Sequence, residues 1–447
     1  GGGPSVKLNG PLVAGGDVNF ASLQFSPDGS RVLYSADQQT NDQLEFFSVP
    51  SSSGPSVKLN GALVSGGFID LSSARFSADG SYVTYLAAQE TAIVKELFRA
   101  PSGGGGSLKL SGPLVAGGDV SAVRYGVAEP RVGYLADQDI NDVQELYSVS
   151  MAGGSPVKMN AAMTGGGVVQ GFFSPDGSRM LYAANPGGEI ITEIYSVPSG
   201  GGVPVKLNGP LAPAGDVSLT GLGFSPDSSM VMYLADQNTD ETWELFCVPA
   251  AGGSAVKLNG SLVLDGDVDN PQFSPNSSRV LYRSDQQVDE LFELYSVPSA
   301  GGMPVKLNAP LTSGGDIVSA MFTADSQYVV YLANQEDNET LELFVVPSAG
   351  GTPEKLNGSL VLGGDVTHWH ISSDSRHVVY RADQDTDEVF ELYSVLLTED
   401  LPGDFNGDEI VDAADYTVWR DTLSQMGPGL AADGDSNGVV NQADYDL

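Results

Sequence analysis

The sequence predicts an all-β fold, an eight-bladed β-propeller of four-stranded blades, followed by a small α-helical tail. Two observations predict this fold class. Each repeat contains four short apolar runs separated by clusters of Gly, Pro, Asp and Ser. Repeats of about 50 residues built from short strands are typical of propeller blades. The repeats are marked by the tripeptide Lys-Leu-Asn or a near variant, which occurs eight times at intervals of 48 to 51 residues and begins at Lys7, Lys58, Lys109, Lys158, Lys206, Lys257, Lys306 and Lys355.

The sixth repeat shows the four predicted strands clearly, at residues 254–258, 269–273, 279–283 and 291–297. Each run is rich in Val, Leu, Tyr and Phe, which favour strands, and the turns between them are rich in Gly, Pro, Asn and Ser. No segment before the tail has the sustained apolar spacing of an amphipathic helix. We therefore expect antiparallel meanders throughout residues 1–396.

The two ends of the repeat region predict how the propeller closes. Residues 5–9 correspond to the last strand of a unit, and residues 390–395 correspond to the third strand. The N-terminal strand is therefore expected to complete the blade that the C-terminal strands begin, with Lys7 beside Glu391. Closure of this kind would remove the open sheet edges that invite aggregation.

A glutamate precedes each later repeat lysine by 13 residues, an offset that spans one hairpin. The constant offset predicts cross-strand ion pairs on the exposed outer edge of each blade. The predicted pairs are Glu45–Lys58, Glu96–Lys109, Glu145–Lys158, Glu193–Lys206, Glu244–Lys257, Glu293–Lys306 and Glu342–Lys355.

The turn after the first main strand carries a recognisable motif. The run Phe25-Ser26-Pro27-Asp28-Gly29 followed by Arg31-Val32-Leu33-Tyr34 resembles the repeat of TolB-type, WD40-like propellers. Residues 173–177 match it equally well, whereas residues 273–277 match it less closely. The resemblance covers nearly the whole repeat region. It implies a propeller fold but no particular function, because propellers carry many functions.

Composition excludes several kinds of partner. The chain has 57 acidic and 20 basic residues, a formal net charge of −37. This charge argues against nucleic acid and anionic membrane surfaces as partners and favours cations. The single cysteine, Cys247, stands where other units have serine, so we expect a small buried side chain. No apolar run reaches transmembrane length, and we expect no membrane insertion.

The tail differs from the repeats. Residues 397–403 are an acidic linker with Pro402 and Gly403, and residues 404–447 contain two loops of twelve residues. Oxygen side chains at loop positions 1, 3, 5, 9 and 12, with the carbonyl of position 7, form a cage for a hard cation, and we expect two Ca²⁺ ions. The expected ligands are Asp404, Asn406, Asp408, Ile410, Asp412 and Asp415 in the first loop, and Asp433, Asp435, Asn437, Val439, Asn441 and Asp444 in the second.

This arrangement resembles the dockerin module of type I, which carries two loop-and-helix repeats. The resemblance implies calcium binding and a cohesin-like surface partner. Two departures put the usual partner contacts in doubt: Ala413-Ala414 and Gln442-Ala443 replace the hydroxyl residues often found there, and the second helix is apparently truncated. The apolar stripe of Tyr416, Trp419 and Leu423 is therefore expected to lack an internal partner and to dock on a neighbouring copy.

The sequence offers little for catalysis. His368 and His370 flank Trp369 on a predicted strand, so both imidazoles face one side, but ordinary strand residues are favoured over a metal site. No nucleophilic triad or phosphate-binding loop occurs. Aspartates recur in two loops of most units, where turn-capping hydrogen bonds are favoured over a ring-shaped cation site. From this we expect that the chain is not an enzyme and has no catalytic residues.

Two functional hypotheses remain. The first is a non-enzymatic extracellular or cell-surface assembly protein, a rigid propeller joined through the calcium tail to copies of itself, as in a filament, or to a cohesin-like surface partner. The alternative is a secreted or surface-tethered propeller that binds a glycan or peptide on its loop face. The loops that diverge between units would hold such a ligand, at Phe68-Ile69-Asp70, Glu129-Pro130 and Pro186-Gly187-Gly188. The chain begins within the repeat pattern and without Met, so we expect a mature or partial chain.

Overall fold

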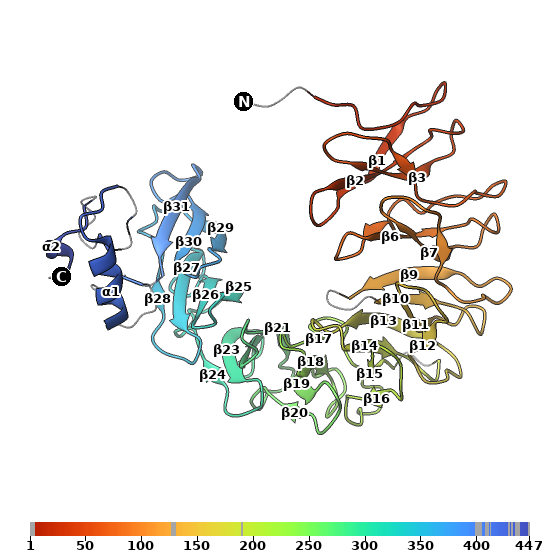
Figure 1. The fold of residues 1–447 in the computed structure, drawn as a ribbon. Coiled ribbons are helices and arrows are strands. Elements are labelled where there is room, and N and C mark those ends of the chain that lie inside the picture. The colour runs from red at the N-terminus through yellow and green to blue at the C-terminus, as the bar shows by residue number, and fades with distance from the viewer. Residues whose placement is uncertain are drawn as a thin grey trace. The chain divides into compact units, whose positions relative to one another are not determined.

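The computed structural model describes residues 5–126, 131–188 and 191–397, and in the tail residues 405–406, 411, 413–427, 430, 432–433 and 439–445. The repeat region forms eight antiparallel sheets, which we call blades 1 to 8 in chain order (Figure 1). Blades 1 to 7 have four strands in the order of the chain, and blade 8 has three. The predicted fold class, an all-β propeller with eight blades, is confirmed.

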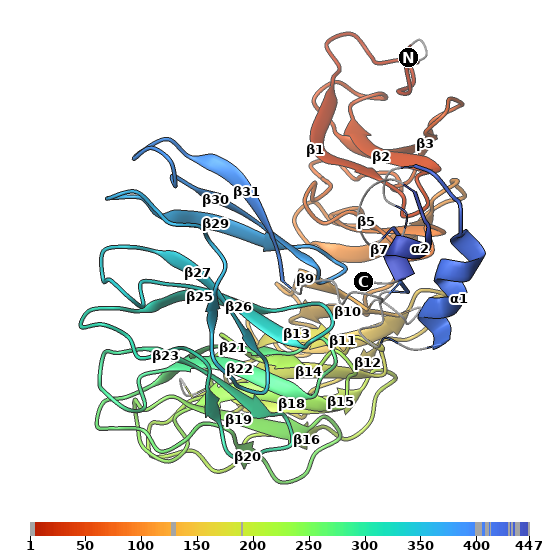
Figure 2. The same cartoon turned by 90° about the vertical axis from the view of Figure 1, so that its left-hand side faces the viewer.

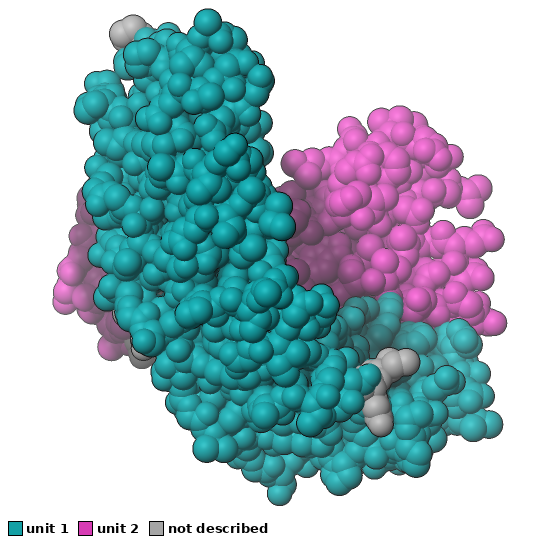
Figure 3. Space-filling view, turned by 90° about the vertical axis from the view of Figure 1, so that its right-hand side faces the viewer, with its two compact units in different colours: residues 1–308, 348–351 teal, residues 309–347, 352–447 magenta. Residues whose placement is uncertain are grey.

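The chain divides into two compact units, residues 1–308 with 348–351 and residues 309–347 with 352–447 (Figure 3). The first unit holds blades 1 to 6. Their strands are β1 (Val18–Phe25), β2 (Arg31–Ala36), β3 (Glu45–Pro50) and β4 (Val57–Lys58); β5 (Arg75–Phe76), β6 (Tyr82–Ala87), β7 (Glu96–Pro101) and β8 (Leu108–Lys109); β9 (Val120–Tyr125), β10 (Arg131–Ala136), β11 (Glu145–Ser150) and β12 (Val157–Lys158); β13 (Val168–Phe173), β14 (Arg179–Ala184), β15 (Glu193–Pro198) and β16 (Val205–Lys206); β17 (Gly223–Phe224), β18 (Met230–Ala235), β19 (Glu244–Pro249) and β20 (Val256–Lys257); β21 (Val268–Phe273), β22 (Arg279–Ser284), β23 (Glu293–Pro298) and β24 (Val305–Lys306).

The second unit holds blades 7 and 8 and the tail. Its elements are β25 (Ile317–Phe322), β26 (Tyr328–Ala333), β27 (Glu342–Pro347) and β28 (Glu354–Lys355); β29 (Val366–Ile371), β30 (His377–Ala382) and β31 (Glu391–Leu396); and the helices α1 (Ala413–Thr422) and α2 (Gln442–Tyr445). In the described part of the chain, neither helix is long and apolar enough to cross a membrane.

In blades 1 to 7 the second and third strands form the buried centre, whereas β31 of blade 8 is largely exposed. Their register places a tyrosine opposite an aromatic residue, as Tyr134 opposite Tyr147 in blade 3. Their rings stack with centroids 5.3 Å apart, and all eight blades repeat this pair with separations of 5.1 to 5.8 Å. Offset stacking of large rings stabilises each strand pair by more than the burial of apolar surface area contributes.

The hydrophobic core lies in layers between consecutive sheets. Leu86 and Leu97 of blade 2 pack with Val132 and Tyr134 of blade 3, and equivalent clusters join the other neighbours within each unit. In the turned view, β29, β30 and β31 of blade 8 run side by side as one sheet (Figure 2). Cys247 is buried in the layer between blades 5 and 6, as predicted.

The predicted strand at residues 5–9, which was to close the propeller, is wrong. Blade 8 has three strands, and residues 5–9 form no strand. Leu8 packs against the core of blade 1, as Leu59 packs against blade 2 and Leu110 against blade 3, so the segment keeps the packing side of the repeat without strand hydrogen bonds. Within the described residues, β31 is the last strand of its sheet.

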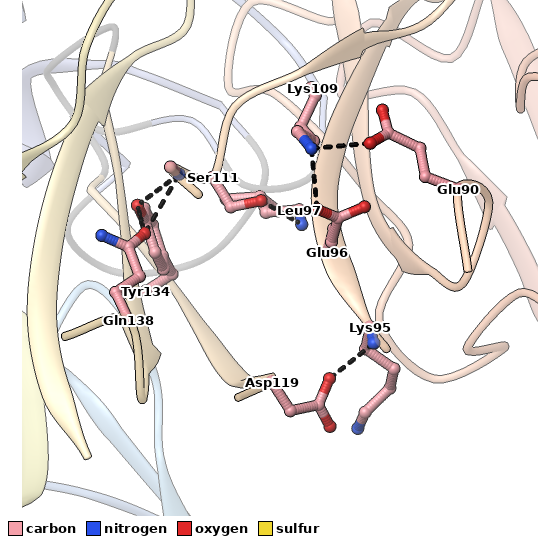
Figure 4. Close-up of polar contacts among 10 residues, drawn as sticks. Glu90, Lys95, Glu96, Leu97, Lys109, Ser111, Asp119, Tyr134 and Gln138 are labelled. Atoms are coloured by element: carbon pink, nitrogen blue, oxygen red, sulfur yellow. Dashed lines mark hydrogen bonds and ion pairs between the residues drawn. The ribbon is translucent and has the colours of Figure 1, made fainter. Parts of the chain in front are cut away.

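A polar contact joins consecutive blades at the outer strand, and we call it the glutamine clasp. Between blades 2 and 3, Gln138 accepts a hydrogen bond from the N–H of Gly112 at 3.0 Å and from the Tyr134 hydroxyl at 2.6 Å (Figure 4). The clasp therefore ties the segment that follows one blade's outer strand to the end of the second strand of the next blade. Glutamines that accept from the equivalent N–H in other blades are Gln89, Gln237, Gln286 and Gln335.

Candidate functional site

The predicted ion pairs are present in all seven blades where the spacing places them. In blade 2, Lys109 lies 2.7 Å from Glu96 and 2.8 Å from Glu90 (Figure 4). The other pairs are Glu45–Lys58, Glu145–Lys158, Glu193–Lys206, Glu244–Lys257, Glu293–Lys306 and Glu342–Lys355. The prediction that they are exposed is wrong, because the glutamate of most pairs is buried and only the lysine is partly exposed. Since all seven blades share the pair, it supports the blade rather than a ligand.

The repeated aspartates cap turns. The backbone N–H of Asp119 donates to Asp137 at 2.5 Å. Asp119 in turn accepts from the N–H of Lys95 in blade 2 at 2.6 Å (Figure 4). Equivalent bonds recur at Asp267 and Asp365. Burial raises the pKa of the Asp119 and Asp267 carboxyls. The prediction of capping hydrogen bonds is confirmed.

The alternative of a metal held by the repeats finds no support. Within the described ranges, no three His, Cys, Asp or Glu side chains are placed to hold a metal ion. His368 and His370 are both exposed on β29 and face one side of the strand, as predicted. We therefore assign both histidines to the surface of blade 8.

The calcium loops are described in part. Asp404, Asp408, Ile410, Asp412, Asp435 and Asn437 lie outside the described residues. Among the other expected ligands, the two aspartates at position 12 are the most buried: Asp415 is 2% exposed and Asp444 0%. Asp415 accepts the N–H groups of Phe405 and Asn406 at 2.8 and 3.0 Å, and Asp444 accepts the N–H of Asn441 at 2.7 Å. Each position-12 carboxylate is thus fixed against its own loop.

The two loops share one small core. Phe405, Trp419, Ala432 and Val440 are buried together, and the Trp419 indole donates to the carbonyl of Asn441 at 2.8 Å. This corrects the prediction that the α1 stripe lacks an internal partner, because Trp419 packs against the second loop and against Tyr445. Tyr416 and Leu423, the other members of the stripe, remain exposed.

The repeat region also contains a cleft of about 400 Å³ between blades 2 and 3. Residues 70–75 supply one wall and β9 supplies the other, so the cleft lies where the repeats diverge at Asp70. Two arginines line it, Arg75 and Arg124. Of the other two divergent loops, Glu129-Pro130 lies outside the described residues, and residues 186–188 do not line the cleft.

The contacts of the two arginines differ. The Arg124 guanidinium donates from Nε to the carbonyl of Gly171 at 2.7 Å and from Nη1 to the carbonyl of Val123 at 3.1 Å. Burial lowers the pKa of Arg124 from its ordinary value. The Arg75 guanidinium lies over the ring of Tyr125, 5.6 Å from its centroid. Sequence reasoning missed this pair, although both arginines precede the aromatic residue of the turn motif.

Comparisons with known proteins bear on the fold. No known protein family matches the chain, and no curated protein matches it. Solved structures similar to it include a TolB-like protein from Agrobacterium tumefaciens (17% identity, 73% of this chain and 90% of that one, TM-score 0.30) and an oligogalacturonate lyase in complex with manganese (12%, 86% and 91%, TM-score 0.36). A prolyl endopeptidase is also similar (12% identity, TM-score 0.38), with 81% of this chain matched to 54% of that one, so the match spans about half its length.

These comparisons correct one expectation from the sequence. We expected that the chain is not an enzyme, but the structures with a similar fold include a lyase and an endopeptidase. The expectation that the chain is not an enzyme is therefore withdrawn. The likeness is one of fold alone, so it assigns no activity to this chain.

Proposed function

We propose that this chain is a propeller protein held in an extracellular or cell-surface assembly by a calcium-binding C-terminal module. The observation that carries the proposal is the pair of position-12 aspartates, buried in equivalent places of two tandem loops. Burying a carboxylate is costly unless it is strongly hydrogen-bonded, paired or bound to a cation. Both carboxylates accept N–H groups of their own loops, and a calcium ion in each loop would add a positively charged partner.

The residues fit such an ion. The loops offer ten side-chain oxygen ligands, seven of them aspartates, and the carbonyls of Ile410 and Val439 complete the expected sets. A site with this many protein oxygen ligands suits Ca²⁺ better than Mg²⁺, because Mg²⁺ usually retains several of its water ligands. Two Ca²⁺ ions would offset four of the seven negative charges, so calcium binding and folding of the module are coupled.

The assembly partner is a second copy of this chain or a cohesin-like surface protein. The module presents exposed apolar side chains beside its core, namely Tyr416, Leu423, Met426 and Tyr445. Exposed apolar groups gathered on one small module favour a protein contact. A contact between unlike surfaces of two copies that does not close on itself would build a filament.

Titration calorimetry with CaCl₂ tests the metal. We expect two equivalents of Ca²⁺ to bind the chain and one to bind Asp415→Asn or Asp444→Asn, since Asn keeps a hydrogen-bond acceptor but loses the charge. Asp421→Asn on α1 lies outside both loops, is exposed, and should still bind two. Binding of no calcium by the unaltered chain would refute the proposal.

Light scattering after size exclusion tests the assembly. In calcium, association of the purified chain would identify the partner as itself, and addition of EGTA should reverse it. A chain that binds two calcium ions but stays monomeric would identify a separate surface protein instead. Assemblies that persist unchanged in EGTA, or in the Asp415→Asn/Asp444→Asn double variant, would contradict a calcium-dependent connection.

A further inference from the structure

The cleft between blades 2 and 3 differs in charge from the rest of the chain. The protein carries a net charge of −37, yet the cleft is lined by two arginines and one aspartate. That aspartate, Asp70, is already engaged: it lies 3.7 Å from Lys95 and accepts the Ser72 hydroxyl at 2.7 Å. The lining of the cleft is therefore locally positive on a strongly negative protein.

Among the described residues, neither arginine of the cleft is paired with a carboxylate. Their hydrogen bonds and ring contact, given above, involve two carbonyls and the face of Tyr125, and among the described residues neither guanidinium forms an ion pair. Elsewhere in the repeats, Arg283 is paired with Asp269. An arginine offers five N–H donors in a fixed fork, so Arg75 and Arg124 retain donors for a ligand.

Comparison of the repeats indicates that the positive charge of these arginines is not needed to build a blade. They occupy the same position of the repeat, immediately before the aromatic residue of the turn motif, in two adjacent units. The other units place different residues there, Gln24, Phe172, Gly223, Gln272, Met321 and His370. A residue needed to build a blade would recur, whereas arginine occurs only in the two blades that border the cleft.

We propose that this cleft binds a small organic or inorganic oxyanion, a carboxylate, sulfate or phosphate group held between Arg75 and Arg124. Guanidinium groups recognise such groups through paired, charge-assisted hydrogen bonds. The hydroxyls of Ser72 and Ser121, which also line the cleft, can accept hydrogen bonds from a polar ligand. A volume of about 400 Å³ accommodates a ligand of the size of one sugar ring. The site is independent of the calcium tail.

The repeat supplies its own test substitution. In blade 1, Gln24 donates to the carbonyl of Ala74 at 2.8 Å, which is the bond that Arg124 makes to Gly171. Arg124→Gln should therefore keep the contact between blades and lose only the charge. Arg75→Gln places the same residue at the other position. Both variants and their combination should unfold at the temperature of the unaltered chain.

Calorimetry at low salt with sulfate, phosphate and glucuronate as probes, and glucose as the uncharged control, tests the site. We expect at least one anion to bind, with affinity lowered about tenfold by either substitution and about a hundredfold by both. Arg420→Gln, which removes a charge in the tail, should leave the affinity unchanged. The anion that binds distinguishes a carboxylate ligand from a sulfate or phosphate.

Two results would overturn the inference. One is that none of the three anions binds the unaltered chain at millimolar concentration. The other is that an anion binds equally well to the folded Arg75→Gln/Arg124→Gln variant. Neither result would affect the calcium proposal, because the tail is intact in both variants.

Discussion

At the scale of single residues, the repeated glutamate must satisfy two oxygens although its side chain is buried. One oxygen pairs with the repeat lysine in every blade where the pair forms. The second depends on the residue two positions later. In blades 3 and 6 it accepts a tyrosine hydroxyl, at 2.8 Å for Tyr147 and 2.9 Å for Tyr295. In blades 1 and 2 phenylalanine stands there, and the second oxygens of Glu45 and Glu96 are buried without a hydrogen-bond partner.

Phe98→Tyr should therefore stabilise the protein. The new hydroxyl would reach the second oxygen of Glu96, as Tyr147 reaches Glu145 one blade further on, and the stacked ring pair with Tyr85 would be kept. Satisfying a buried acceptor contributes about 1 kcal/mol. Urea denaturation should show a higher midpoint with an unchanged slope.

Phe246→Tyr is the matched control. Blade 5 also has phenylalanine at this position, but the second oxygen of Glu244 already accepts from the Asn238 amide. The same substitution should therefore give no gain there. Equal stabilisation by both changes would show that the unsatisfied oxygen is not the cause.

The turn aspartates predict an acid response. Hydrogen bonds from the Ser26 hydroxyl, at 2.6 Å, and from the Ser30 backbone lower the pKa of Asp28 to about 2. The unfolded chain has an Asp pKa of about 3.9. Because the folded pKa is the lower one, the stabilisation is full above about pH 4 and is lost as pH falls toward 2.

Asp28→Asn should consequently flatten the dependence of the melting temperature on pH between about pH 4 and pH 2. The substitution is tolerated by the repeat, since Asn276 occupies this position in blade 6 and accepts the Ser278 N–H at 3.0 Å. The comparison is made by calorimetry against the unaltered chain. An equally steep decline in both would exclude Asp28 as a source of the acid response.

Residue patterns predicted some of these contacts and not others. The offset of 13 residues predicted the ion pairs because it recurs in every unit, but burial of the glutamate depends on packing of the next blade and has no local signal. The serines of the weaker turn motifs, such as Ser277, also gave no signal. Ser277 adopts a left-handed φ of 64° and accepts the N–H of Asp227 from the preceding blade at 3.0 Å, so its contact explains why serine can replace glycine there.

At the scale of elements, the fourth strand of blades 1 to 7 is short. In blade 6 only Val305 and Lys306 pair with β23, opposite Ser296 and Tyr295. The sequence predicted the longer strands of this blade within one or two residues. It overestimated the outer strand of the preceding blade, where residues 254–258 were expected and β20 spans only Val256–Lys257.

Lys306→Met should detach part of this outer edge. It leaves the Glu293 carboxylate, whose side chain is 6% exposed, without its cation, and we expect a loss of about 1–3 kcal/mol in the free energy of unfolding. Lys206→Met is the internal comparison, because Glu193 is 24% exposed and water can replace the lysine, so the loss should be under about 1 kcal/mol. The two losses are measured by urea denaturation of each variant. Equal losses in the free energy of unfolding would show that burial of the glutamate does not set the strength of the pair.

At the scale of the whole molecule, the last strand of the repeats ends its sheet. Leu392 of β31 is 76% exposed, and among the described residues the strand has no outer neighbour in its sheet. The repeat pattern predicted a strand at residues 5–9, but the pattern alone cannot show whether a segment forms strand hydrogen bonds. It also could not show the arginine cleft, since that site depends on two neighbouring units.

Leu392→Lys should reduce self-association that depends on this edge, because a charge on an edge strand disfavours pairing with another chain. Sedimentation velocity over a range of protein concentrations would show the reduced association. EGTA is included to prevent any calcium-dependent association through the tail. Leu362→Lys adds the same charge at a loop residue that is 99% exposed and should have no effect. Equal behaviour of both variants would show that β31 is not a pairing edge.

The glutamine clasp has a consequence for how such a chain can evolve. Most repeats present the glycine or alanine N–H on one flank and the tyrosine and glutamine on the other, so neighbouring junctions are chemically interchangeable. An in-frame duplication of one repeat therefore adds a blade whose two sides already form the hydrogen bonds that its neighbours need. The number of blades can then change by recombination within the gene, and no new contact between blades has to evolve first. In blade 4, Pro186 replaces the glutamine, so the junction between blades 3 and 4 matches the other junctions least well.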